Sequence, residues 1–224
     1  RQVFVRLAGC NISCSYCDTQ ESFQTPLNAK AEVLPGERSF RLMANPVPLD
    51  ALVDAVTCLC QNPHHSVSIT GGEPLLHPAA IRALSAVRTA GAKIFLETNG
   101  TMPDALSEVI DTVDIVSMDI KLPEILSGRQ FWQEHAKSLT LAATREVYVK
   151  IVLTGDTPQA EFLRAVKLIA GVDRNIPLVL QPVTPVHNIK AITAQSLLNW
   201  QSQALEELCT VRVIPQTHKL LGVL

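Results

Sequence analysis

Three cysteines near the start of the chain constrain it more than any other feature. Cys10, Cys14 and Cys17 form a Cys-x3-Cys-x2-Cys run directly after an apolar, strand-like segment, and no fourth cysteine follows at ligand spacing. Three thiolates can hold three irons of a cubane iron–sulfur cluster and leave the fourth iron open to an exogenous ligand. An open metal position is typical of chemistry, whereas a fully ligated one is typical of structure or electron transfer. The run therefore predicts a reactive metal centre.

The alternative for such a run is a zinc site completed by a distant ligand. Cys58, Cys60, Cys209 and six histidines are available. Structural zinc sites usually draw their ligands as two close pairs, and no second Cys-x2-Cys or His-x3-His occurs in the sequence. The spacing favours the cluster. Cys58 and Cys60 are two apart on a predicted helix, so we expect them to point to different faces as ordinary core or surface residues.

Length and charge narrow the function classes. A chain of 224 residues is long enough for one α/β domain with a substantial core, so we predict a single domain over residues 1–224. A formal charge of −2 argues against a phosphate-binding surface and therefore against direct nucleic-acid binding. We also expect no membrane-spanning segment and no secretory leader. Six cysteines without a disulfide-rich composition indicate a reducing compartment, the cytoplasm.

Apolar, β-branched segments alternate with helical patterns along the chain. Strands are predicted at residues 2–7, 66–70, 93–97, 115–119, 146–153, 177–181 and 210–214. Helices are predicted at residues 49–60, 78–90, 103–110, 158–169 and 191–208, with Pro78, Pro103 and Pro158 in first turns and Gly91 and Gly171 as stops. This alternation implies parallel strands with right-handed crossovers, in a doubly wound sheet or an incomplete barrel. No Gly-x-Gly-x-x-Gly follows the first strand, which weakens the dinucleotide-binding version.

Two segments fit the alternation less well. Residues 20–48 show little periodicity and several Pro, Asn and Gly residues, so we interpret them as an insertion after the cysteine loop, a lid or a partly mobile segment. The connection at residues 122–144 is expected to hold one or two irregular helices.

Polar residues gather where the predicted strands end. In parallel α/β folds these ends converge, and the working side chains collect there. The polar groups are at residues 10–19, 70–74, 97–100, 119–121, 150, 181–182 and 216–219. Gly71 and Gly72 at one strand exit allow a ligand to approach the backbone closely. Glu97, Asp119 and Lys121 fit either a functional site or a buried ion-pair network.

These residues together resemble the radical S-adenosylmethionine (SAM) superfamily. The resemblance rests on the three-cysteine run with Tyr16 before its last cysteine, and on Thr-Gly-Gly-Glu-Pro at residues 70–74. It implies an α/β fold of the partial (β/α)6 TIM-like barrel type, a [4Fe-4S] cluster held by Cys10, Cys14 and Cys17, and SAM on the open iron. An electron delivered through the cluster would then cleave the C–S bond of SAM and give a 5′-deoxyadenosyl radical.

A finer resemblance is to the 7-carboxy-7-deazaguanine synthase family of queuosine and deazapurine biosynthesis. It rests on residues 4–11, 17–19, 97–100 and the tail 215–224. The resemblance implies a lyase that contracts 6-carboxy-5,6,7,8-tetrahydropterin with loss of ammonia and requires Mg²⁺. The strand that precedes Arg6 in this family, with Gln and Glu contacts to the pterin, is absent from the sequence, and the 20–48 insertion is longer than in the shorter members.

By the same resemblance, each expected site residue takes a role. The SAM-binding residues would be Tyr16, Cys17, Asp18, Gly72, Asp119, Ile120, Lys121, Gln181 and Pro182. The substrate-binding residues would be Arg6, Thr70, His218 and Leu224, the last through its free carboxylate. Thr19 would contribute a hydroxyl to Mg²⁺, with substrate oxygens and water filling the octahedron.

Partners follow from the resemblance as well. We expect a small pterin substrate, an electron donor such as flavodoxin, and a homodimer. A second enzymatic interpretation is an activase that takes hydrogen from a glycine of a partner protein. Such an enzyme needs a wide mouth for a polypeptide loop and usually shows different residues after the last cysteine than the Asp18-Thr19 pair.

Overall fold

A computed structural model describes residues 1–185, 189–217 and 219. Its seven-stranded sheet has the order β1-β4-β5-β6-β7-β8-β9. Apart from the two strands of a separate hairpin, the order follows the chain and never reverses, as in a barrel-type sheet rather than a doubly wound one. The predicted α/β class, a partial (β/α)6 TIM-like barrel, is thereby confirmed.

The chain divides into two compact units that interleave along the sequence. The first comprises Arg1–Asn11, Thr19–Thr98 and Asp104–Val116, and the second comprises Ile12–Asp18, Asn99–Pro103 and Ser117–Leu224. The boundary falls within β6 (Ile115–Asp119), all of whose residues are buried. One domain over the whole chain stays a prediction.

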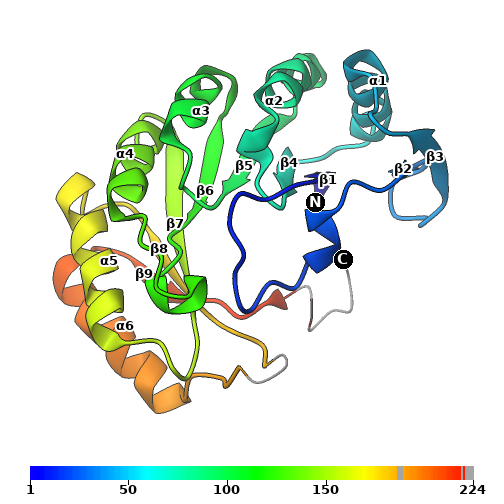
Figure 1. The fold of residues 1–224 in the computed structure, drawn as a ribbon. Coiled ribbons are helices and arrows are strands. Elements are labelled where there is room, and N and C mark those ends of the chain that lie inside the picture. The colour runs from blue at the N-terminus through cyan, green and yellow to red at the C-terminus, as the bar shows by residue number, and fades with distance from the viewer. Residues whose placement is uncertain (186–188, 218, 220–224) are drawn as a thin grey trace. The chain divides into compact units, whose positions relative to one another are not determined.

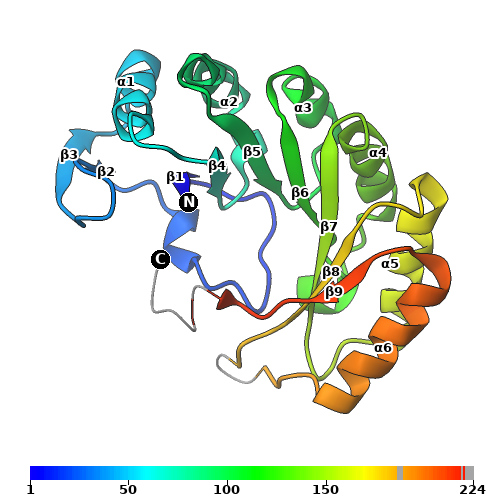
Figure 2. The ribbon, with the colours of Figure 1, turned by 180° about the vertical axis from the view of Figure 1, so that it is seen from behind.

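Three parallel strands form the centre of the first unit: β1 (Gln2–Leu7), β4 (Ser66–Gly71) and β5 (Lys93–Thr98). Helices α1 (Leu49–Cys60), α2 (Pro78–Leu84) and α3 (Pro103–Ser107) lie along one side of these strands in Figure 1 and in the reverse view of Figure 2. The apolar side chains between the layers are fully buried, among them Val67, Ile69, Leu84, Ile94 and Leu96. In β4 the apolar Val67 and Ile69 alternate with Ser66, Ser68 and Thr70, and all five are buried, so this strand is covered on both faces although one face is polar.

The insertion after the cysteine loop forms a hairpin, which its weak periodicity did not predict. After a 3₁₀ turn at Gln20–Phe23, β2 (Asn28–Glu32) pairs antiparallel with β3 (Phe40–Ala44). The Glu32 carboxylate accepts hydrogen bonds from the backbone N–H groups of Gly36 and Arg38 at 3.0 and 2.9 Å, and so closes the turn. Periodicity failed here because no residue of either strand is buried and the turn is closed by two hydrogen bonds to one carboxylate.

The second unit is built on β7 (Glu146–Leu153), β8 (Leu178–Pro182) and β9 (Val211–Val213), again parallel. Its helices are α4 (Trp132–Ala142), α5 (Gln159–Val172) and α6 (Ala194–Glu207). Phe162 of α5 is fully buried and stacks on Trp200 of α6, with ring centroids 4.9 Å apart. The aromatic pair joins the two helices over this part of the sheet.

Most predicted boundaries agree with the structure, and the differences have local causes. The predicted helix at 78–90 is α2 followed by a 3₁₀ segment, Ser85–Ala90, and Gly91 ends it with a φ of +80° as expected. Gly171 is not a stop, because α5 continues to Val172. Pro158 is the N-cap residue that precedes α5, and it does not lie in the first turn of the helix. The 122–144 connection holds a 3₁₀ turn, Pro123–Leu126, and α4, as predicted.

No helix within the described residues is long and apolar enough to cross a membrane.

Phe162→Ala should destabilise the chain by about 3–5 kcal/mol, because it removes a fully buried aromatic ring and leaves a cavity beneath Trp200. The matched control is Leu198→Ala on α6, whose side chain is 55% exposed and whose loss should change stability by less than about 0.5 kcal/mol. Urea unfolding of both variants measures the difference. Equal costs at the two positions would contradict the described packing.

Candidate functional site

The three cysteines of the amino-terminal run lie on the loop that follows β1. Cys10 belongs to the first unit, and Cys14 and Cys17 belong to the second. All three are half-buried. The Cys17 N–H donates to the Cys14 carbonyl at 3.1 Å, so these two residues bracket a tight turn.

The chemistry of this donor set fits an iron–sulfur cluster. The six cysteines, all described, form no disulfide bond, and three of them share one loop. Among the described residues, no three His, Cys, Asp or Glu side chains are gathered at the spacing that holds a single metal ion, and this applies to the three thiols as well. Thiolates are the ligands of Fe–S clusters. Cys58 is exposed and Cys60 buried on α1, as predicted for residues on different faces.

The glycine pair after β4 packs directly against the start of this loop. Gly72 N–H donates to the Leu7 carbonyl at 3.2 Å, and Glu73 N–H donates to the Gly9 carbonyl at 2.8 Å. A Cβ at Gly72 would lie 2.1 Å from the Gly9 oxygen and 2.8 Å from the Cys10 Cβ. Only glycine permits this approach. The backbone of β4 therefore holds the residues that present Cys10.

Two further side chains secure the same region. His77 Nε2 lies 2.6 Å from the Ala8 carbonyl oxygen, at the residue before Gly9. Glu73 is fully buried, and its carboxylate accepts from Thr98 Oγ1 at 2.9 Å and from the Leu75 N–H at 3.0 Å. The buried carboxylate thus ties the turn after β4 to the end of β5.

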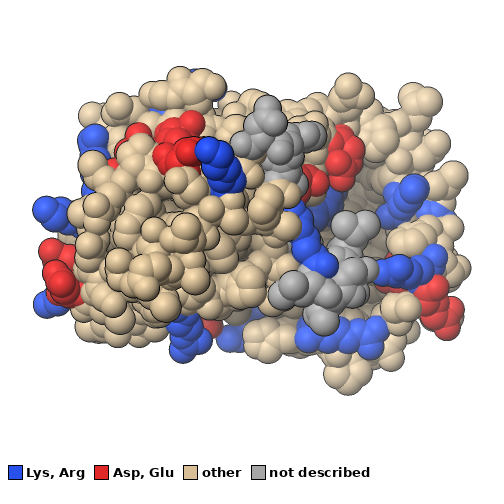
Figure 3. Space-filling model, turned by 90° about the horizontal axis from the view of Figure 1, so that it is seen from below, with Lys and Arg blue, Asp and Glu red and all other residues tan. Residues whose placement is uncertain are grey.

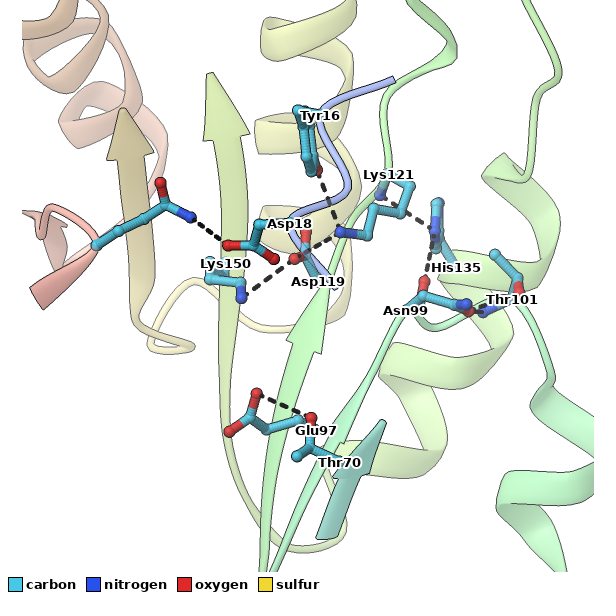
Figure 4. Close-up of polar contacts among 11 residues, drawn as sticks. Tyr16, Asp18, Thr70, Glu97, Asn99, Thr101, Asp119, Lys121, His135 and Lys150 are labelled. Atoms are coloured by element: carbon cyan, nitrogen blue, oxygen red, sulfur yellow. Dashed lines mark hydrogen bonds and ion pairs between the residues drawn. The ribbon is translucent and has the colours of Figure 1, made fainter. Parts of the chain in front are cut away.

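Arg6 and Thr70, both predicted to bind substrate, are neighbours across β1 and β4. The parallel register pairs them directly. Arg6 is exposed, whereas Thr70 is 8% exposed and donates to a Glu97 carboxylate oxygen at 3.5 Å (Figure 4). Ser68 also donates to Glu97, at 3.1 Å. A basic group and a hydroxyl–carboxylate pair therefore lie on adjacent strands of the first unit.

A buried charge network lies at the carboxyl end of β6 (Figure 4). Lys121 Nζ lies 2.9 Å from Asp119 Oδ2 and donates to the Tyr16 hydroxyl at 3.1 Å. The same ammonium lies 5.1 Å from the centre of the Tyr16 ring. Lys150 of β7 reaches Asp119 Oδ2 at 3.2 Å. Three predicted SAM-binding residues, Tyr16, Asp119 and Lys121, are thus brought together, and the alternative of a buried ion-pair network holds for Asp119 and Lys121 as well.

The electrostatics keep this pair charged. Burial alone would raise the pKa of Asp119, but the Lys121 and Lys150 ammonium groups outweigh it and hold that pKa below its ordinary value. Burial alone would lower the pKa of Lys121, but the Asp119 carboxylate leads the opposing effects and the pKa is raised well above its ordinary value. Burial is also the main reason that the pKa of Tyr16 is raised, so its phenol stays protonated and neutral.

One carboxylate oxygen of this network has no hydrogen-bond partner among the described residues. It is Asp119 Oδ1, which is buried. A buried carboxylate oxygen in this condition carries a desolvation cost that a ligand N–H or O–H group would relieve.

The residue after the last cysteine is held by the carboxyl-terminal segment. Asp18 Oδ2 accepts from Gln216 Nε2 at 3.1 Å and lies 3.3 Å from Lys219 Nζ. Gln216 Oε1 in turn accepts from the Thr184 N–H at 3.0 Å. The tail segment that the sequence marked as polar therefore contacts the cysteine loop at Asp18.

His135 of α4 lies next to the charge network, against the backbone of Lys121. Its side chain is fully buried, and Nε2 donates to the Asn99 carbonyl at 3.1 Å (Figure 4). The Lys121 backbone nitrogen lies 3.4 Å from the same ring nitrogen. Burial lowers the pKa of His135 to about 4, so the ring is neutral near pH 7.

The remaining predicted residues are dispersed. Gln181 and Pro182 end β8, Ile120 is buried with its N–H donating to the Lys150 carbonyl, and Thr19 is half-buried before the 3₁₀ turn. His218 and Leu224 lie outside the described residues. Lys150 is predicted at a strand end but lies inside β7 between the apolar residues Val149 and Ile151, and this apolar setting was the available signal for its ion pair.

Charged side chains of both signs lie on the surface. Figure 3 shows Lys and Arg side chains interspersed with Asp and Glu on one face of the molecule, with uncharged residues between them.

Comparison with known proteins decides the family. The radical SAM superfamily model matches residues 5–124. A 7-carboxy-7-deazaguanine synthase of Geobacter sulfurreducens is 43% identical over 228 residues, which cover 100% of this chain and 90% of that protein. The synthases of Thermococcus kodakarensis and Methanocaldococcus jannaschii are each 31% identical, and the matches cover 100% of this chain and 90% and 93% of theirs. The chain belongs to the 7-carboxy-7-deazaguanine synthase family of the radical SAM superfamily.

Solved structures agree with this family at the level of the fold. A radical SAM methyltransferase from Sphaerobacter thermophilus matches with a TM-score of 0.62 at 12% identity, covering 95% of this chain and 66% of that one. Streptococcus suis SuiB bound to S-adenosylmethionine matches with a TM-score of 0.62 at 11% identity, covering 95% and 46%. Membership of the radical SAM superfamily implies a [4Fe-4S] cluster and SAM, for which the thiol donor set is suited.

Gly72→Ala should destabilise the fold by about 1–3 kcal/mol and reduce the iron bound per chain, because its Cβ would overlap the backbone next to Cys10. Gly171→Ala in α5 is the matched control, since a Cβ there meets nothing within 4 Å. Iron analysis after anaerobic reconstitution, together with urea unfolding, measures both effects. Full iron and stability in the Gly72 variant would contradict the close approach.

His135 should make folding sensitive to acid. Because the folded chain excludes a proton that the unfolded chain takes up, stability should fall as the pH drops from about 6.5 towards 4, by up to about 3 kcal/mol. In His135→Gln this contribution is absent, so the stability difference between variant and wild type should narrow between pH 7 and pH 4. Urea unfolding at both pH values tests this, with His65→Gln, an exposed histidine, as the control. A stability difference between wild type and His135→Gln that stays constant between the two pH values would refute the burial of a neutral His135.

Proposed function

We propose that the chain is a carbon–nitrogen lyase that converts 6-carboxy-5,6,7,8-tetrahydropterin to 7-carboxy-7-deazaguanine with loss of ammonia. The observation that carries this proposal is the 43% identity to a protein named 7-carboxy-7-deazaguanine synthase, over the whole of this chain and 90% of that protein. The thiol donor set of the cysteine loop and the charge network of the second unit, each taken by itself, support the same activity.

The chemistry needs a cofactor and a shielded site. When bound, the cluster and SAM together supply the electron and the 5′-deoxyadenosyl radical that abstracts hydrogen from the substrate. The task of the protein is to position the substrate C–H bond and to exclude water and other hydrogen donors. Cys10, Cys14 and Cys17 would be the iron ligands.

Several polar groups would hold SAM. The unpartnered Oδ1 of Asp119 is suited to a donor group of SAM, and the neutral Tyr16 hydroxyl is kept in place by Lys121. Asp18, held by Gln216, would accept from a second donor group. The remaining proposed SAM contacts are Cys17, Gly72, Ile120, Gln181 and Pro182.

Substrate binding would use the strands of the first unit. The exposed guanidinium of Arg6 is suited to fork onto the pterin carboxylate, and its register neighbour Thr70 offers a hydroxyl. His218 and the carboxylate of Leu224 would complete recognition from the tail. Thr19 would give its hydroxyl to Mg²⁺, a weak ligand whose contribution depends on substrate oxygens in the same shell.

The proposal also covers the electron donor, the oligomeric state and the cellular compartment. An electron donor such as flavodoxin would reduce the cluster, and the protein would act as a homodimer in the cytoplasm, where thiols stay reduced. The product would feed queuosine synthesis and so tRNA modification, without direct contact between this chain and nucleic acid.

One assay tests the activity. Reconstituted protein with reductant, SAM, Mg²⁺ and the carboxy-tetrahydropterin should release 7-carboxy-7-deazaguanine and ammonia, detected by mass spectrometry. Formation of 5′-deoxyadenosine only when a protein substrate is added would instead support the activase. Stoichiometric zinc without iron would contradict both enzymatic interpretations.

Thr19→Ala should weaken the dependence of turnover on Mg²⁺, so that about tenfold more of the ion is needed for half-maximal rate, as expected for the loss of one ligand. Cluster assembly should be unaffected, because a hydroxyl is not an iron ligand in this proposal. A Mg²⁺ titration and an iron analysis on the same sample separate the two effects. Loss of iron with unchanged Mg²⁺ dependence would show that the residue supports the loop instead.

A further inference from the structure

A largely buried ammonium is held against the cysteine loop. The Lys121 side chain is 13% exposed, and its Nζ lies 3.1 Å from the Tyr16 hydroxyl and 5.1 Å from the centre of the same ring. Tyr16 lies between Cys14 and Cys17 in the sequence. The positive charge is thus fixed on the part of the loop that carries two of the three thiols.

The charge of this network does not sum to zero. Asp119 carries one negative charge, while Lys121 at 2.9 Å and Lys150 at 3.2 Å each carry a positive one. The three groups together leave a net charge of about +1, on the ordinary ionisation of lysine and aspartate. Lys121 donates to the hydroxyl of Tyr16, which is two residues from Cys14 and one from Cys17. The charged network therefore adjoins the part of the loop that carries two of the proposed iron ligands.

A fixed charge at such a place changes the energy of electron transfer. Net charge and hydrogen bonding around the sulfurs are among the factors that set the reduction potential of an Fe–S cluster. Reduction adds one negative charge, and a nearby cation stabilises the reduced state more than the oxidised state, especially where water is scarce. A nearby anion has the opposite effect.

We propose that Lys121 raises the reduction potential of the cluster on the Cys10–Cys17 loop and that Asp119 lowers it, so that this ion pair tunes electron entry. The inference deepens the proposed function and rests on the cluster that the function requires. It assigns to Lys121 an electrostatic role towards the metal centre, in addition to its proposed contact with SAM.

Removing the cation and removing the anion should shift the reduction potential in opposite directions. Lys121→Met removes the cation and should weaken one-electron reduction about tenfold, a shift of about 59 mV to more negative potential. Asp119→Asn removes the anion but keeps an acceptor oxygen for Lys121, and should shift the potential by a similar amount in the positive direction. Lys121→Arg keeps the charge and should stay close to wild type. Lys167→Met, which removes an exposed charge on α5, is the control and should not shift.

The measurement is an anaerobic redox titration of reconstituted protein, followed by electron paramagnetic resonance, without SAM or substrate. Shifts of the same sign in the Met and Asn variants, or no shift in either, would overturn the proposal. If Lys121→Met fails to hold a cluster, Asp119→Asn decides: a positive shift supports the proposal, and an unchanged or more negative potential refutes it.

The proposed function and the tuning role of Lys121 and Asp119 can be refuted separately. A wild-type chain that takes up no iron would refute the proposed function itself. A wild-type chain with about four irons, the cubane stoichiometry, whose potential ignores both charge changes would refute only the tuning role.

Discussion

The close approach of two backbones at Gly72 is the constraint on which the cysteine loop depends. The N–H groups of Gly72 and Glu73 donate to the carbonyls of Leu7 and Gly9 at 3.2 and 2.8 Å, and a side chain at Gly72 would have no room. His77 binds the carbonyl immediately before this contact. A loop that must present thiols without a compact hydrophobic core of its own is ordered in this way by backbone contacts at its root. The glycine pair therefore has a structural role in addition to any contact with a ligand.

The second recurring device is the use of buried charge. Asp119, Lys121 and Lys150 form ion pairs in surroundings where either partner alone would be costly, and the neutral Tyr16 phenol extends the network to the loop. His135, neutral and fully buried, donates to the carbonyl of Asn99, the residue that follows β5 in the sequence, and lies against the Lys121 backbone. The polar groups at these strand ends are thus positioned by one another as well as by the sheet, which is what an ordered binding site needs.

The sequence predicted the regular frame well and the irregular contacts poorly. The helix at 49–60 and the strands at 2–7, 115–119 and 146–153 have the predicted bounds, because apolar periodicity reports burial directly. The hairpin at residues 28–44 was not predicted, since its order comes from Glu32 closing a turn on exposed strands. Tyr16 and Lys121 are 105 residues apart, and the prediction that they share a site came from the convergence of strand ends and from the family resemblance. Lys150, flanked by Val149 and Ile151 inside β7, shows that a charge within an apolar stretch can predict a buried ion pair.

The central claim is that three thiolates of one loop leave one iron of a cubane open to SAM. Mössbauer spectroscopy of protein reconstituted anaerobically with ⁵⁷Fe, recorded before and after addition of SAM, tests this most directly. The account predicts about four irons per chain, one of which changes its signal when SAM is added while the other three do not. Four irons that remain indistinguishable with SAM present, or a site filled by zinc, would contradict it.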